Sequence, residues 1–260
     1  MLLFLPFYRT IALKRFDNFN PILIILLIPL TIITSFNGPL NPAVSLIICP
    51  MYLVYKWWVN YRESKQIHFF KKAANAFFSI PKQILIFFIF ISLLSLYSLY
   101  IGHFNSAFLD KTIPILNRYL LLPKGLFLQL TKSIGPLLLI LVIGINCIIL
   151  NQQKDSTEAK GLLNKLKWIG IFSTIYILLL PLGGYREYRP YIIRSDTFMP
   201  INLCLFYFYG ISTLYIINHY FSELKGVYLT ILISVLIVFT LADKTDYNLS
   251  TCEKESLKVI

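Results

Sequence analysis

Charged side chains gather in one short segment of a strongly apolar chain, LPLGGYREYRPYIIRSDTFMP, residues 179–199. Its arginines, Arg186, Arg189 and Arg194, are candidate anion-binding residues, because a guanidinium donates two parallel hydrogen bonds to a phosphate or carboxylate. Glu187 and Asp196 neutralise at most two of these three cations. The segment therefore predicts recognition of an anionic group. The alternative is a salt-bridge cluster that contacts only itself and lipid headgroups.

Tyrosines recur with a period of three through the same segment, at Tyr185, Tyr188 and Tyr191. Pro190 disfavours helical geometry in the residue before it. A period of three with a proline predicts an extended strip of the polyproline-II type, with the tyrosines along one edge. A first helical turn is the alternative, since it would also bring the first two arginines to one side. Tyrosine is common at the headgroup level of membranes, so these three are supporting site residues.

Asp196 has two interpretations. It stands in SDTFMP, where a long apolar run begins. Aspartate accepts hydrogen bonds from the free N–H groups of a helix's first turn, and its charge suits the helix N-terminus. We expect Asp196 to cap this helix, with a catalytic role as the alternative. The other groups on the predicted outer side that could act as acid or base are Glu187, Asp110 and His103.

The composition places these residues in a membrane protein. Of the 260 residues, 57% are hydrophobic and 14% are charged, whereas a soluble domain carries about a quarter charged residues. The net charge of +12 comes mostly from short segments between apolar runs. In such segments lysine and arginine orient helices against the lipid surface. We therefore expect membrane lipids as partners and no nucleic acid.

Seven apolar segments come close to the roughly 20 residues that a helix needs to cross the hydrocarbon. They are residues 20–36, 43–59, 83–101, 134–151, 167–182, 199–219 and 226–242. The expected fold is an all-α polytopic transmembrane helix bundle of about seven spans, forming one integral membrane domain over residues 1–260. The short turn NGPLNP predicts that the first two spans are a tightly linked pair.

The distribution of lysine and arginine predicts the orientation. Nine of them lie in the N-terminal segment and around the connection between the second and third spans, if Lys56 near the inner end of the second span is counted, whereas the turn between the first two spans has none. Positive connections stay in the cytoplasm, and early helices usually dominate the choice. We therefore expect a cytoplasmic N-terminus in a multi-pass protein of the cytoplasmic (inner) membrane.

Two connections are expected to lie along the membrane surface. Residues 63–82 alternate phenylalanine with lysine at helical spacing, which predicts a basic amphipathic helix on the inner surface. That helix either docks anionic lipid or a partner, or simply anchors the chain. Residues 105–132 are apolar but interrupted by charges and prolines, so we place them along the outer interface. A partly re-entrant segment is the alternative.

Recognisable catalytic and metal-binding motifs are missing. The sequence has no GxSxG, HExxH or GxxxxGK[ST] pattern, and its four cysteines show no CxxC spacing. The histidines, His68, His103 and His219, fall on alternating sides of the predicted membrane. We therefore expect no metal site and no cofactor, and the chain leans away from being an enzyme.

Three functional classes follow from these features. The leading one is recognition of an anionic or lipid-linked molecule at the outer face through the arginine-rich segment, within envelope glycan or lipid metabolism. A second is a non-catalytic subunit that binds other membrane proteins. A third is a facilitator or exporter with a water-filled path lined by polar span residues, Ser92, Ser95, Ser98 and Asn146. Such residues also serve simply to pack helices together, which is their commoner role.

Overall fold

The computed structural model describes residues 21–64, 68–104, 113–131, 134–153, 156–183, 191–219 and 225–242. Within these residues the regular elements are all helical and no strand occurs. A backbone inside lipid has no water to pair with, and a helix satisfies its N–H and C=O groups within one segment. The prediction of an all-α fold is confirmed.

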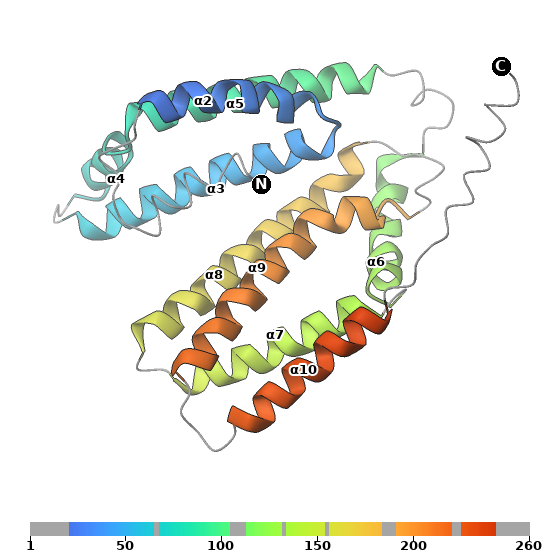
Figure 1. Ribbon diagram of the computed structural model, residues 1–260. Helices are drawn as coiled ribbons and strands as arrows, with labels where there is room; N and C mark the ends of the chain where they lie inside the picture. The colour runs from blue at the N-terminus through green and yellow to red at the C-terminus, as the bar shows by residue number, and fades with distance from the viewer. Residues whose placement is uncertain are drawn as a thin grey trace, which may run out of the picture. The chain divides into compact units, whose positions relative to one another are not determined.

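The helices follow one another with short connections (Figure 1). They are α2 (Pro21–Phe36), α3 (Leu40–Glu63), α4 (Phe69–Phe78), α5 (Lys82–His103), α6 (Ile115–Thr131), α7 (Ile134–Gln152), α8 (Thr157–Leu179), the 3-10 helix η3 (Leu180–Gly183), α9 (Ser195–His219) and α10 (Lys225–Ala242).

Five of these helices are long and apolar enough to cross a membrane. The candidate spans are Leu40–Glu63, Lys82–Gly102, Ile134–Gln152, Thr157–Gly183 and Ser195–His219. Shorter apolar helices cover Leu27–Phe36 and Gly226–Leu241, within α2 and α10. These lengths and compositions identify a multi-pass membrane protein.

The chain divides into two compact units. Unit 1 is Met1–Leu126 with Lys167–Ile201, and unit 2 is Phe127–Leu166 with Asn202–Ile260. In unit 1, α3 packs against α2, α4 and α5, and α2 also packs against α5 (Figure 1). In unit 2, α7 packs against α10.

The apolar core of unit 1 is built between α2, α3 and α5. The Tyr52 and Phe88 rings meet edge to face, with 5.3 Å between centroids, which is a favourable aromatic geometry. Together the core residues join α2, α3 and α5. They are Leu27, Cys49, Tyr52, Ile84, Phe87, Phe88 and Ile91.

The first two described helices form a tightly linked pair, as predicted. Only residues 37–39 separate α2 from α3. Gly38 has a φ of 77°, a left-handed conformation that glycine adopts without steric cost. The Asn41 side chain donates a hydrogen bond from Nδ2 to the carbonyl oxygen of Asn37 at 3.2 Å, which closes the turn.

Several helix ends lie beyond the predicted spans. α8 begins at Thr157, ten residues before the predicted start at 167, and α3 continues to Glu63. α4 covers only residues 69–78 of the predicted amphipathic segment 63–82. Hydropathy marks where a helix leaves the hydrocarbon, and a charged helical turn can continue past that point.

Candidate functional site

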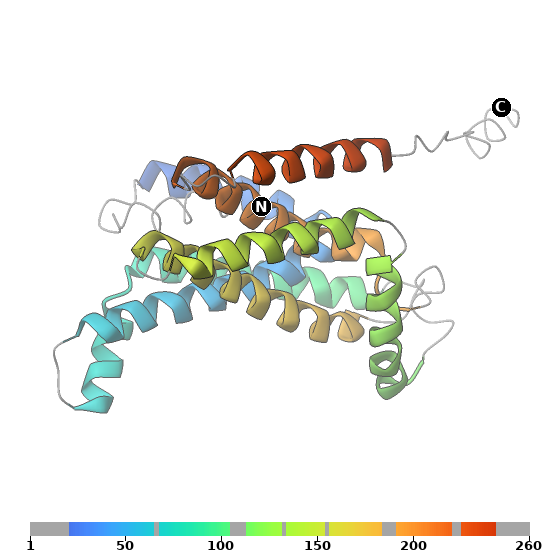
Figure 2. The same ribbon diagram turned by 90° about the horizontal axis from the view of Figure 1, so that it is seen from below.

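Helix α6 runs across the end of α8, as Figure 2 shows. Within unit 1 its packed stripe is Arg118, Leu122 and Gly125, whose spacing of four and three places them on one face. Leu122 and Gly125 are buried and Arg118 is half-buried. On the other face, Leu116 and Leu120 are 73% and 71% exposed. α6 therefore has one packed side and one apolar side without a partner among the described residues.

Arg118 and Tyr119 attach α6 to the end of α8 and to η3. Arg118 donates from Nε to the carbonyl oxygen of Ile113 at 2.8 Å and from Nη1 to that of Pro181 at 3.2 Å. The Tyr119 hydroxyl donates to the carbonyl oxygen of Leu178 at 3.0 Å. The last carbonyls of a helix have no intrahelical partner, so these side chains satisfy acceptors that would otherwise lack one.

Gly125 allows the chain before α9 to lie directly on α6. A Cβ atom at this position would overlap the carbonyl oxygen of Tyr191. It would also lie 3.2 Å from the Cβ atom of Tyr191 and 3.3 Å from that of Ile193. The close approach of two backbones here therefore requires glycine.

The chain on top of Gly125 makes a strained turn. The Ile193 N–H donates to the carbonyl oxygen of Tyr191 at 2.7 Å, which closes a γ-turn centred on Ile192. Ile192 has a φ of 66°, an uncommon conformation for a β-branched residue. Such strain, of order 1–3 kcal/mol, persists only where packing imposes it, and it is found most often at binding sites. Ile192 and Ile193 are both buried, which supplies that packing.

Two cationic residues lie next to this turn, and Arg118 lies about two helical turns before Lys124 on α6. The Lys124 ammonium nitrogen lies 4.7 Å from the centre of the Tyr191 ring. Arg194 is exposed and follows the turn directly. We call Arg118, Lys124 and Arg194, together with the Tyr191 ring, the cationic cluster. Within the part of the chain that the structure describes, Arg118 and Lys124 make no salt bridge, so their charges are not neutralised by a carboxylate there.

The first turn of α9 fixes the backbone of Arg194. The Thr197 hydroxyl accepts the Arg194 N–H and donates to the Arg194 carbonyl oxygen, both at 2.8 Å. The Tyr176 hydroxyl donates to the carbonyl oxygen of Thr197 at 2.9 Å. Asp196 Oδ1 accepts the N–H of the next residue, Thr197, at 2.8 Å. The Arg194 carbonyl oxygen accepts the Phe198 N–H at 2.9 Å, so Arg194 holds the N-cap position that was expected for Asp196. Asp196 lies in the first turn of α9, where its negative charge suits the helix N-terminus.

The structure describes part of the predicted site. Tyr191, Arg194 and Asp196 lie at the start of α9 as set out above. The other predicted site residues, Tyr185, Arg186, Glu187, Tyr188 and Arg189, lie outside the described residues, as do Asp110 and the side chain of His103. The predicted polyproline-II strip stays a prediction for the same reason.

Sequence reasoning did not assign Arg118, Lys124 or Gly125 to this site. They belong to the segment 105–132, which the sequence predicts to be a separate interfacial element. The available signal was topological, because that segment and the arginine-rich segment are both predicted on the outer side. No sequence pattern indicates that the two connections touch.

Unit 2 contains a buried hydrogen-bonded group that we call the polar clamp: Asn146, Ser212, Thr213 and Tyr228. Asn146 Nδ2 donates to Ser212 Oγ at 2.8 Å and to Thr213 Oγ1 at 3.1 Å. The Tyr228 hydroxyl donates to Asn146 Oδ1 at 2.9 Å and lies 3.3 Å from Thr213 Oγ1. The clamp therefore joins α7, α9 and α10 through side chains alone.

The clamp bears on the transport alternative. Both N–H donors of the Asn146 amide are engaged within it, so this side chain packs helices together. The serines of α5 belong to unit 1; Ser95 is fully buried, and Ser92 and Ser98 are half-buried. The described contacts favour helix packing over a solute path at Asn146.

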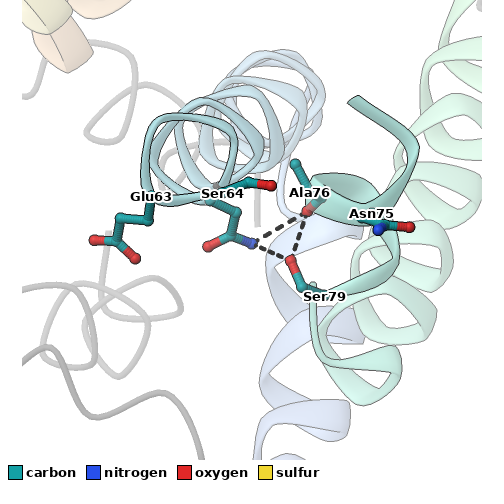
Figure 3. Close-up of a pocket in the computed structure, with 6 residues that line it drawn as sticks. Glu63, Ser64, Asn75, Ala76 and Ser79 are labelled. Carbon is teal, nitrogen blue, oxygen red and sulfur yellow. Dashed lines mark hydrogen bonds between the residues drawn. The ribbon is translucent and has the colours of Figure 1, made fainter. Parts of the chain in front are cut away.

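A polar pocket of about 340 Å³ lies between the end of α3 and α4 (Figure 3). Asn60 Nδ2 donates to Ser79 Oγ at 2.8 Å and to the carbonyl oxygen of Ala76 at 3.2 Å. In Figure 3 the Glu63 carboxylate points away from this hydrogen-bonded group. The lining residues are Asn60, Glu63, Ser64, Asn75, Ala76 and Ser79.

Metal ligation and similarity to known proteins give no further identification. Among the described residues, no group of three His, Cys, Asp or Glu side chains could hold a metal ion. The cationic cluster itself presents guanidinium and ammonium groups and a tyrosine ring. No family model, curated protein or solved structure matches the chain.

Proposed function

We propose that the chain is a seven-span protein of the cytoplasmic membrane, with its N-terminus inside, α4 on the inner interface and α6 on the outer interface. α2 and α10 have 16 and 18 residues, so each is about 24–27 Å long. The bilayer thins locally around a span that is slightly short. The bond from Arg118 to Pro181 supports the threading, because both connections are assigned to the outer side.

The function we propose is recognition of an anionic or lipid-linked molecule at the cationic cluster. The observation that carries it is the close approach of α6, which bears Arg118 and Lys124, to the chain that leads into Arg194, at Gly125. Asp196 is the acid described in the first turn of α9. Arg118 uses only Nε and one N–H of Nη1 for carbonyl oxygens, so further donors remain. An anion bound there would receive charge-assisted hydrogen bonds.

A lipid-linked ligand fits the surroundings of the cluster better than a free anion does. The exposed face of α6 presents Leu116 and Leu120 along the same helix as Arg118 and Lys124. Apolar side chains this exposed are stable in lipid rather than in water. A ligand with a phosphate at headgroup level and a chain in the hydrocarbon would contact both kinds of surface. The proposed role is that of a binding component in envelope glycan or lipid metabolism.

A comparison of cell lipid and metabolite profiles tests this function. Cells lacking the protein are complemented with the wild type, with Lys124→Gln/Arg194→Gln, or with Arg189→Ala, at matched protein levels in the membrane. Lys160→Gln/Lys167→Gln is the control, because it removes two exposed cations from α8. We expect the wild type and the control to restore the profile, and the two site variants to fail.

The outcomes separate the proposal from its alternatives. If the site variants restore the profile as well as the wild type, the cationic cluster is scaffolding and the proposal is wrong. If deleting the protein leaves the profile unchanged, a role in lipid or glycan metabolism is wrong. If the site variants fail, the molecule that accumulates identifies the ligand class.

A further inference from the structure

Aromatic side chains collect on the last two turns of α3. The Trp58 and Tyr61 rings are stacked, with centroids 6.1 Å apart and planes 16° apart. The ring centroids of Trp57 and Tyr61 are 5.6 Å apart. Phe69, at the start of α4, meets the Tyr61 ring edge to face with 6.0 Å between centroids. Tryptophan and tyrosine concentrate at the headgroup level of a bilayer, so this cluster marks the depth at which α3 leaves the hydrocarbon.

Two cations are held on these stacked rings. The Arg62 guanidinium carbon lies 5.2 Å from the centre of the Trp58 ring, and Lys72 Nζ lies 4.7 Å from that of Tyr61. Within the described residues, neither Arg62 nor Lys72 forms a salt bridge. A cation over an aromatic face keeps its charge and its N–H donors. Both side chains are therefore positioned and still able to bind an anion.

Helix α4 is fixed to α3 at the same depth. Trp57 Nε1 donates to the carbonyl oxygen of Ala73 at 3.0 Å, and Asn60 Nδ2 donates to that of Ala76. Ala76 is buried against this contact. The large side chains of α4 point elsewhere: Phe70 and Phe78 are 85% and 80% exposed, and Phe69 and Phe77 are exposed as well.

We propose that α4 and the aromatic end of α3 form a binding surface for anionic phospholipid. The exposed phenylalanines enter the acyl region, while Arg62 and Lys72 bind headgroup phosphates at the level of the aromatic rings. Lys71 adds a third cation, whose side chain is exposed, and Glu63 is the acid in the described residues of this surface. The excess of positive charge selects an anionic lipid over a zwitterionic one.

Charge and polarity argue against the other occupants of this surface. A second copy of the chain docked on the same face would bring like charges together, which disfavours association. If the surface faced water, four exposed phenylalanine side chains would be solvated, which is unfavourable for apolar groups. The polar pocket beside Ser79 adds amide and hydroxyl groups to this surface, with Glu63 as the charged residue among the described residues that line it. The proposal concerns α3 and α4 and does not depend on the cationic cluster.

Fluorescence quenching by brominated lipid tests the surface in the full-length protein. A bimane label is placed at Phe70→Cys, in a background where the four native cysteines are alanine. The protein is reconstituted into two preparations of phosphatidylcholine vesicles. One contains acyl-brominated phosphatidylglycerol, and the other contains the same amount of acyl-brominated phosphatidylcholine. We expect the anionic quencher to be enriched beside the label, by about fivefold for each cation that contacts a headgroup.

Charge-removing variants identify the cause of the enrichment. Arg62→Gln/Lys72→Gln should bring quenching by the two brominated lipids to the same level. Lys160→Gln/Lys167→Gln removes the same charge elsewhere and should leave the enrichment unchanged. Phe78→Cys serves as a second reporter, because its side chain is almost as exposed as that of Phe70.

Two results would overturn the proposal. Equal quenching by both brominated lipids in the labelled protein that retains Arg62 and Lys72 would mean that α4 only anchors the chain through its phenylalanines. Absence of quenching at both reporter positions would mean that this surface faces water or another protein. In either case the complementation test of the cationic cluster could still succeed, so the two proposals fail independently.

Discussion

The polar clamp of unit 2 can be weakened one hydrogen bond at a time. Tyr228→Phe removes the hydroxyl that donates to Asn146 at 2.9 Å and lies 3.3 Å from Thr213. Asn146→Ala removes this acceptor together with two donated hydrogen bonds. Because all of these atoms are buried, neither lipid nor water replaces the lost partner.

The expected magnitudes follow from the number of bonds lost. Hydrogen bonds between membrane helices contribute about 0.6 kcal/mol on average and at most about 1.7 kcal/mol. Tyr228→Phe should therefore lower the free energy of unfolding by about 1 kcal/mol, and Asn146→Ala by about 2 kcal/mol. The double variant should lose about 0.6 kcal/mol less than the sum, since the two residues share one bond.

Unfolding in mixed micelles, followed by circular dichroism, measures these differences. Ser234→Ala is the matched control on α10, because its exposed hydroxyl donates only to the carbonyl oxygen of Thr230 in its own helix. We expect the control to change stability by less than about 0.5 kcal/mol. If Asn146→Ala is no more destabilising than Ser234→Ala, or if the two clamp variants are strictly additive, the clamp does not hold the helices together.

Three further substitutions test contacts in unit 1. Gly125→Ala should displace the γ-turn and speed amide exchange there, because the added Cβ overlaps a backbone carbonyl, whereas Gly144→Ala, with open space around it, should have no such effect. Thr197→Val should cost about 1 kcal/mol, measured by thermal unfolding, because it removes the hydroxyl that accepts the Arg194 N–H and donates to the Arg194 carbonyl oxygen at the start of α9; an unchanged midpoint would contradict that role. Trp57→Phe should speed amide exchange in α4 by removing an indole hydrogen bond, while Trp168→Phe should leave α4 unaffected.

The elements that were predictable from sequence are those governed by hydropathy. Each of the five long apolar helices overlaps a predicted span, because the bilayer requires both an apolar surface and internal backbone pairing. The tight α2–α3 turn was also predictable, since a short uncharged NGPLNP segment leaves little other choice. The positions of helix ends were less predictable from the sequence. α8 begins at Thr157, in a segment with several charged residues, and hydropathy does not detect that such a segment is helical.

The contacts that build the candidate site depend on packing between distant segments. The bond between Arg118 and Pro181 joins residues 63 positions apart, and no local pattern encodes it. Ile192 adopts a positive φ although its residue type disfavours it, because surrounding packing imposes the turn. Lys56 stands near the end of a predicted span, where a lysine usually reaches water, yet it is only 5% exposed.

The polar clamp also determines when, during synthesis, the packing of α7, α9 and α10 can be completed. Asn146 precedes Tyr228 by 82 residues. At a translation rate of about 5–20 residues per second, Tyr228 is synthesised roughly 4–16 s after Asn146. Only then can its hydroxyl complete the hydrogen bonds of the Asn146 amide. During that interval a polar carboxamide is held at the translocon or in lipid without its final partner. A chain arrested before α10 would keep this amide without the hydrogen bond that Tyr228 supplies.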